Sequence, residues 1–230
     1  SVNKLDLATT AELAEAIDVL SQQDDIRGLL VTSAKSVFIV GADIGEFTEM
    51  FKLAEVDFID RVGTVTQPLN RLEEMAFPTV VAINGYALGG GLEVCLACDY
   101  RVISKTAAIG LPETTLGIIP GWGGTVRLPR LSGISTALQW ITSGVAQNAE
   151  KALAANVIDE IIEPDQLRTV ALARLTEFAA GHLEYQNRRK TKLQPVTDNA
   201  VEISTSIKQY RTTFGGVRVP KHSSFEESLN

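Results

Sequence analysis

The sequence predicts an α/β fold in which short buried strands alternate with amphipathic helices. Two runs of aliphatic and β-branched residues, 26–32 and 78–84, are typical of strands buried on both faces. Apolar residues recur at helical spacing over 7–23 and again over 44–75. Because strands joined through helices pair in parallel, we expect a parallel sheet built from βαβ units.

The composition is that of an ordinary globular protein and argues against two classes. Of the 230 residues, 45% are hydrophobic and 21% are charged, and no apolar run reaches the ~18 residues that a membrane span needs. The formal net charge of −7 disfavours a nucleic-acid partner, because phosphate binding depends on clustered Lys and Arg. We therefore expect no membrane span and no nucleic-acid role.

The two cysteines, Cys95 and Cys98, lie three residues apart in an apolar segment. Such a pair could bind zinc or carry redox chemistry, but the histidines, His182 and His222, lie far away in the sequence. We expect two buried thiols and no metal site. Low cysteine usage and the lack of a visible secretory signal favour a cytoplasmic location.

Local signals place the elements in order along the chain. The first helix has Thr9, Thr10 and Glu12 as its expected capping residues, and the 44–75 helical region should break or kink near Pro68 with a loop near 52–57. The remaining predictions are strands at 37–40, 100–103, 108–110 and 157–162, and helices at 92–97, 125–144 with a break at Gly133, 149–155 and 164–180.

The character of the sequence changes beyond Glu184, where a basic segment precedes a stretch of weak apolar content. We place a domain boundary near Pro195, with a catalytic core over 1–195 and a C-terminal helical appendage over 196–230. Because the chain begins at Ser1 without Met, we expect it to be a fragment of a longer protein.

Glycines and glutamates are concentrated between Asn84 and Gly124. The clusters Gly89–Gly91 and 121–124 bracket two glutamates, Glu93 and Glu113. Glycine permits close approach of a ligand to the backbone, and a helix that starts directly after a strand presents unpaired N–H groups. This arrangement predicts an anion site for a phosphate, or for an oxygen that becomes negative during reaction.

The common phosphate and nucleophile motifs do not match. A dinucleotide loop requires Gly or Ala where Val94 stands, no glycine cluster is followed by GKS or GKT, and the serine motif GxSxG lacks its last glycine at Ala137. An oxyanion hole remains, and it ordinarily needs two donors. The second candidate is the GADI segment at 41–44, where a strand ends at glycine and a helix begins.

Three segments in this order and spacing resemble the crotonase (enoyl-CoA hydratase/isomerase) superfamily. They are GADI at 41–44, NGYALGGGLEVCLACDYR at 84–101 and GLPETTLGIIPGWGGTVRLPRL at 110–131. Among its members, the sequence is most similar to the N-terminal hydratase/isomerase domain of the bacterial fatty-acid oxidation complex alpha subunit. The resemblance implies a crotonase-like spiral of repeated ββα units, followed by helices.

The resemblance also implies roles for individual residues. The backbone N–H groups of Ala42 and Gly90 would hold the thioester carbonyl, Glu93 would activate water, and Glu113 would protonate the α carbon. Gly121 would start a helix whose N–H groups orient the water. Further expectations are an acyl pocket lined by Phe47 and Trp122, a helix cap at Asp43, solvated charges at Arg101 and Lys105, and structural or exposed histidines.

The function that the resemblance implies is hydration of trans-2-enoyl-CoA in fatty-acid β-oxidation, with 3-enoyl-CoA isomerisation as a second activity of the same site. It implies no metal and no cofactor, since coenzyme A is part of the substrate. One or two strands before Ser1, a dehydrogenase module beyond the chain and a thiolase subunit as partner are expected in the full-length protein, and the oligomeric state stays open. The alternatives are a non-catalytic acyl-CoA-binding or partner-binding domain, and thioester hydrolysis or decarboxylation, against which both glutamates argue.

Overall fold

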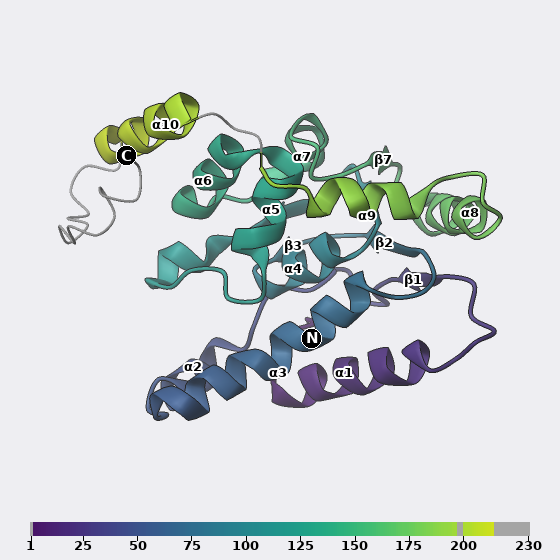
Figure 1. Cartoon of the computed structure of the whole chain (residues 1–230), viewed down its shortest axis with the longest axis horizontal. Coiled ribbons are helices and arrows are strands. Elements are labelled where there is room, and N and C mark those ends of the chain that lie inside the picture. The colour runs from purple at the N-terminus through teal and green to yellow at the C-terminus, as the bar shows by residue number, and fades with distance from the viewer. Residues whose placement is uncertain (1, 197–199, 214–230) are drawn as a thin grey trace. The chain divides into compact units, whose positions relative to one another are not determined.

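The computed structural model describes residues 2–196 and 200–213, which form two compact units (Figure 1). The first unit spans Ser1–Thr197 and the second spans Asp198–Asn230. The described part of the second unit is one helix, α10 (Ala200–Thr213). We treat each unit by itself, and the candidate site lies in the first.

Helices and strands alternate through the first unit. Its helices are α1 (Leu7–Ser21), α2 (Ile44–Met50), α3 (Glu55–Glu73), α4 (Gly90–Ala97), the 3-10 helix η1 (Pro112–Leu116), α5 (Gly124–Ser132), α6 (Ile134–Ser143), α7 (Ala149–Ala154), α8 (Leu167–Ala179) and α9 (Tyr185–Leu193). Its strands are β1 (Leu29–Val31), β2 (Thr79–Ile83), β3 (Ala87–Leu88), β4 (Tyr100–Ser104), β5 (Ala108–Gly110), β6 (Gln147–Asn148) and β7 (Glu160–Ile162).

The main sheet has the strand order β1-β2-β4-β7, and every neighbouring pair in it is parallel. In the central pair, Val80 lies opposite Tyr100 and Ile83 lies opposite Ile103. This arrangement confirms the predicted α/β fold with a parallel sheet. A smaller sheet has the strand order β3-β5-β6, and its strand β3 ends directly before the glycine cluster.

Both faces of β2 are buried, which explains its unbroken aliphatic sequence. Successive side chains of a strand point to opposite faces. Val80 and Ala82 pack in a cluster with Leu167 and Ala171 of α8, whereas Val81 and Ile83 belong to the larger core around α4. The sheet is therefore covered on both sides and holds α4 in the interior.

Glycine is required at the junction between β3 and α4. Gly89 has φ +53°, in the left-handed region that side chains rarely adopt, and α4 begins directly after it at Gly90. A Cβ at Gly91 would collide with the backbone oxygen of Ile39. Residues 37–40, predicted as a strand, contain only an isolated bridge from Ile39 to Ala87. The absence of a side chain at Gly91 lets the backbone at Ile39 lie against the first turn of α4, which brings the segment from 39 to 45 beside the glycine cluster.

Two local predictions about helices are wrong. The cap of α1 is Asp6, whose side chain accepts a hydrogen bond from the Thr9 N–H, rather than Thr9 or Thr10. Pro68 does not break α3, which runs through it, although the predicted interruption near 52–57 does occur between α2 and α3. Burial of Leu69 and Leu72 in the core favours continued helix beyond the proline.

The prediction that Arg101 is a solvated charge is wrong. The residue lies in β4 and is 1% exposed. Its Nε donates to the Val157 carbonyl oxygen at 2.7 Å, and its Nη2 lies 3.0 Å from Asp159 Oδ2. The basic segment after Glu184 forms α9, where Arg188 also pairs with Asp159. Arg101 is therefore the buried member of a network whose other members, Asp159 and Arg188, are half-buried.

Candidate active site

A cavity of about 860 Å³ lies between α2, α3, η1 and the first turn of α4. It brings together segments that are far apart in the sequence, including the GADI segment, the glycine cluster and the 112–122 loop. All the residues singled out from the sequence line this cavity: Ala42, Phe47, Gly90, Glu93, Glu113, Gly121 and Trp122.

Glu93 lies in the first turn of α4 and is 1% exposed. Its Oε1 accepts hydrogen bonds from the backbone N–H of Trp122 at 2.8 Å and of Gly124 at 2.7 Å. A Cβ at Gly124 would lie 2.9 Å from that same oxygen, so glycine is needed for the N–H to approach. These two bonds fix the carboxylate at the wall of the cavity.

The pKa of Glu93 is raised to about 7. Burial is the largest cause, and the negative charge of Glu113 acts in the same direction. The hydrogen bonds from Gly124 and Trp122 and the positive charge of Arg127 oppose this rise. A carboxyl group with this pKa exchanges its proton near neutral pH, as acid–base catalysis requires.

Glu113 enters the cavity from η1, directly after Pro112. Its Oε2 is buried and has no hydrogen-bond partner within residues 2–196 and 200–213. A Cβ at Gly89 would lie 3.0 Å from Glu113 Oε1, so the glycine leaves room for this side chain. Burial raises the pKa of Glu113. A buried carboxyl oxygen without a partner is costly, which points to a group that a bound molecule would satisfy.

Ala42 and Gly90 line the cavity, and their backbone N–H groups bond to no acceptor among the described residues. Gly90 is the first residue of α4, so its N–H has no acceptor within the helix. Ala42 forms a parallel bridge with Leu5, in which Leu5 N donates to Gly41 O and Asp43 N donates to Leu5 O. Both bonds are made by the residues on either side of Ala42, and the N–H of Ala42 itself points away from Leu5.

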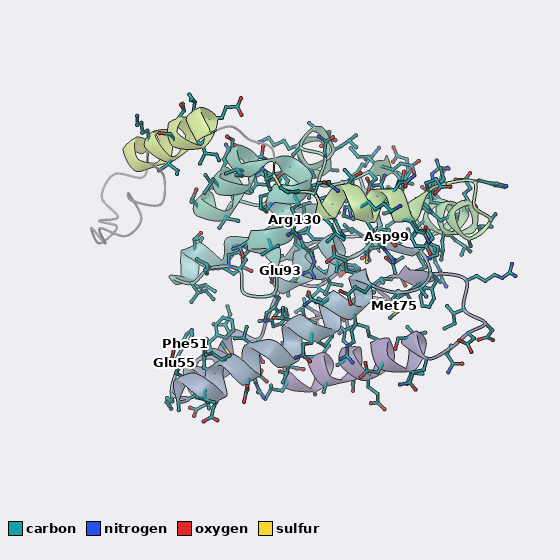
Figure 2. The ribbon with its side chains drawn as sticks, in the orientation of Figure 1. Phe51, Glu55, Met75, Glu93, Asp99 and Arg130 are labelled. Carbon is teal, nitrogen blue, oxygen red and sulfur yellow. The ribbon has the colours of Figure 1, made fainter. Side chains whose placement is uncertain are left out.

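Aromatic side chains form the wall of the cavity. A Cβ at Gly90 would lie 2.5 Å from Trp122 Cζ3, so the indole ring rests directly on the backbone at this glycine. On the α2–α3 side, the rings of Phe47 and Phe51 lie 5.9 Å apart, and those of Phe51 and Phe58 lie 6.5 Å apart. Figure 2 shows Glu93 near the middle of the fold and Phe51 at the outer end of α2.

The expected helix start at Gly121 is wrong. Helix α5 starts at Gly124, after Gly123 with φ +104°, and Gly121 lies in the loop before it. The N–H groups of this loop for which bonds are recorded, at Trp122 and Gly124, contact Glu93. Asp43 caps α2 through a bond from Gly45 N, as predicted.

The sequence did not identify Arg127 as a site residue, although this buried arginine contacts the loop before α5. It is 4% exposed, and its Nη1 donates to the Trp122 carbonyl oxygen at 3.1 Å. The sequence holds a weak signal, because Arg127 lies beside Leu128 on a helix that starts at the second glycine cluster. Its partners could not be found from sequence spacing alone.

Cys95 and Cys98 are free and buried, as predicted. Within residues 2–196 and 200–213, no three His, Cys, Asp or Glu side chains are grouped as metal ligands would be. The helices in the same part of the chain are each too short or too polar to cross a bilayer.

Comparisons with known proteins agree with this geometry. The enoyl-CoA hydratase/isomerase family model matches residues 1–221. The chain is 43% identical over 229 residues to the fatty acid oxidation complex subunit alpha of Pseudomonas syringae pv. tomato, and 42% identical to that of Pseudomonas aeruginosa. Each alignment covers 100% of this chain and 32% of the relative, so the chain spans about a third of the length of these curated relatives.

Solved structures show the same fold. The crystal structure of an enoyl-CoA hydratase from Bacillus anthracis superimposes with a TM-score of 0.71 at 30% sequence identity. The superposition covers 98% of this chain and 88% of that one. With the family model matched over almost the whole length and the crotonase fold shared, the chain belongs to the enoyl-CoA hydratase/isomerase family.

Proposed function

We propose that this chain adds water to trans-2-enoyl-CoA, with Glu93 and Glu113 as the acid–base pair. The observation that carries the proposal is that buried Glu93 and half-buried Glu113, both with a raised pKa, line one cavity together with Ala42 and Gly90. Hydration of a conjugated thioester needs these parts: a base for water, an acid for the α carbon, and donors for the thioester oxygen.

The N–H groups of Ala42 and Gly90 are the proposed oxyanion hole. As water adds to the β carbon, electrons of the double bond move toward the thioester carbonyl and its oxygen gains negative charge. Donors that are already in place stabilise this charge without reorganisation, and removing one such donor typically costs about 10²–10³-fold in rate. The partial positive charge at the start of α4 acts on the oxygen in the same direction.

The two carboxyl groups then share the proton transfers. Ionised Glu93 takes a proton from the attacking water, and protonated Glu113 gives its proton to the α carbon, so that one proton is taken up for each one released. Mutual repulsion of the two carboxylates favours the state that holds one proton between them. Gly121, beside Glu93 in the cavity wall, is proposed to help place the water.

Phe47 and Trp122 are proposed to contact the acyl chain, because they lie in the apolar wall that continues from the acid–base pair toward α2. Isomerisation of 3-enoyl-CoA at the same site is a second candidate activity. The unpaired Oε2 of Glu113 favours it, since one mobile proton and an oxyanion hole are sufficient for a shift of the double bond.

The names of the relatives support a role in fatty-acid β-oxidation as part of a larger protein. We propose that residues 1–195 form the catalytic core and 196–230 a helical appendage leading toward the rest of that protein. A thiolase subunit as partner, a cytoplasmic location and the absence of any cofactor beyond the coenzyme A of the substrate belong to the same proposal.

The direct test is loss of the conjugated thioester absorbance of crotonoyl-CoA in the presence of the purified chain. Hydration should be measurable above the buffer rate, and a 3-hydroxyacyl-CoA product should appear by mass spectrometry. A folded chain that binds crotonoyl-CoA without converting it would instead support a non-catalytic acyl-CoA-binding domain. Release of free thiol would indicate thioester hydrolysis.

A further inference from the structure

We propose that Arg127 is a positioning residue for this reaction, because it holds the 122–124 loop against Glu93 and places a positive charge behind that carboxylate. The inference rests on the proposed function for its catalytic meaning. Its structural basis is a continuous set of contacts that starts on α9 and ends at Glu93. None of these partners touches the reacting atoms.

The first contacts are those of the Arg127 guanidinium. Nη1 donates to the Trp122 carbonyl oxygen at 3.1 Å, and Trp122 is the residue whose N–H binds Glu93 Oε1. Nη1 also packs so closely against Gly123 that a Cβ there would displace it. The guanidinium thus supports the loop from behind, between the two N–H groups that hold Glu93.

The remaining guanidinium nitrogens fix the side chain of Arg127 itself. Nε donates to Glu73 Oε2 at 2.9 Å, and Nη2 donates to Asn70 Oδ1 at 2.7 Å, both on α3. The planar guanidinium group thus donates to three different acceptors, an arrangement that lysine cannot reproduce. Because the side chain is 4% exposed, little water is present to replace these bonds or screen the charge.

Glu73 is in turn held by α9. Lys192 Nζ lies 2.7 Å from Glu73 Oε1 and donates to the Leu96 carbonyl oxygen of α4 at 2.9 Å. Burial alone would raise the pKa of Glu73, but the charges of Lys192 and Arg127 outweigh it, and the pKa is lowered. The ionised Glu73 therefore anchors Arg127, and α9 contributes to the site through Lys192.

The charge of Arg127 favours the ionised form of Glu93. Among the described residues, Glu113 of η1 disfavours ionisation of Glu93 and Arg127 of α5 favours it. Behind Arg127, Glu73 of α3 pairs with both Arg127 and Lys192 of α9. Loss of the guanidinium charge should hence shift the Glu93 titration to higher pH.

The test is a pH titration of the Glu93 side-chain carboxyl carbon by ¹³C NMR, assigned through the signal that disappears in Glu93→Gln. We expect Arg127→Gln to raise the midpoint, because a positive charge that favours ionised Glu93 is lost. The matched control is Arg130→Gln on the same helix, because Arg130 is exposed and should leave the midpoint unchanged. An unchanged midpoint in folded Arg127→Gln would overturn the electrostatic part of the proposal.

Arg127→Lys separates charge from geometry and tests the proposal even where Arg127→Gln does not fold. It retains the ion pair with Glu73 but cannot serve all three acceptors, so kcat/KM for crotonoyl-CoA should fall about tenfold, as for one lost hydrogen bond to a charged group. The acid limb of its pH profile should stay near the wild-type position. Wild-type kcat/KM in Arg127→Lys would overturn the positioning role.

The two readouts also distinguish this inference from the proposed function. If the wild-type chain is inert toward crotonoyl-CoA while Arg127→Gln still shifts the NMR midpoint, the hydratase assignment fails and the link from Arg127 to Glu93 stands. If the wild-type chain is active and neither Arg127 variant changes the midpoint or kcat/KM, the inference fails alone.

Discussion

Glu93, in the first turn of α4, and Asp99, two residues beyond the end of that helix, are both buried carboxylates, and Figure 2 labels both. Asp99 is held by Arg189, whose Nε and Nη2 donate to its two oxygens at 2.6 and 2.8 Å, and by the N–H and hydroxyl of Thr79. Glu93 has backbone donors and a guanidinium that reaches it only through the loop.

This difference separates a carboxylate fixed by side-chain partners from the one proposed to react. Arg189 binds both oxygens of Asp99 and compensates for its burial. Glu93 faces a second carboxyl group across the cavity and has a pKa raised to about 7, so its proton can move. An ion pair thus lies just beyond the end of α4, and the proposed proton-transfer group lies in its first turn.

The largest expected effect is on catalysis at the first turn. Glu93→Gln and Glu113→Gln should each lower kcat for crotonoyl-CoA by about 10²–10⁴-fold, because a general acid or base contributes that much. Steady-state assays on folded protein give the values, with Glu12→Gln on the exposed face of α1 as the control. Activity that survives both substitutions would show that the assigned roles are wrong.

Substitution at the other end of α4 should affect stability. Asp99→Asn leaves the guanidinium of Arg189 with only carbonyl partners and should lower the free energy of unfolding by about 3–5 kcal/mol. Urea denaturation measures this change, and Asp24→Asn at an exposed position is the control. A loss below about 1 kcal/mol is typical of a solvent-exposed ion pair, and it would show that the pairing of Asp99 with Arg189 adds little to stability.

The raised pKa of Glu93 makes stability depend on pH. The folded state holds the proton of Glu93 up to about pH 7, whereas the unfolded chain releases it near its ordinary value of 4.5. Folding therefore loses stability as pH rises between these values, by up to roughly 3 kcal/mol. Glu93→Gln removes this loss.

The measurement is urea denaturation of Glu93→Gln and wild type at pH 5 and pH 8. The variant should gain stability relative to wild type at the higher pH. A difference that stays constant between the two pH values would mean that Glu93 titrates near its ordinary range.

The smallest expected effect concerns the anchoring of α9, which carries Arg189. The Tyr185 hydroxyl donates to the Ala76 carbonyl oxygen at 2.8 Å, and Arg189 lies over the Tyr185 ring. Tyr185→Phe keeps the ring and removes the hydroxyl, so the free energy of unfolding should fall by about 1 kcal/mol. Tyr86→Phe, at an exposed tyrosine, is the matched control in the same denaturation series. Equal values for the two variants would show that this bond adds nothing to the docking of α9.

Local features of the sequence predicted most of the fold and the residues of the candidate site. The aliphatic run of β2, the glycines before α4 and the two glutamates each act within a few residues, through burial, backbone freedom and helix termini. Prediction is weaker where several nearby residues could give the same signal or where a local signal opposes packing. Asp6 caps α1 although Thr9 and Thr10 were predicted to do so, and α3 continues through Pro68 because its next turn is buried in the core.

The sequence by itself determined the α/β class, through short-range backbone signals, and the candidate residues Ala42, Gly90, Glu93 and Glu113, through motifs that resemble a known family. Only the tertiary structure decided which charges are buried and paired. The partners of Arg101, Arg127 and Arg189 lie 58, 54 and 90 residues away, a separation across which sequence spacing carries no signal. The fold buries Arg101 and Arg127 and pairs each arginine with its distant partner, and burial of Glu93 itself is the largest cause of its raised pKa.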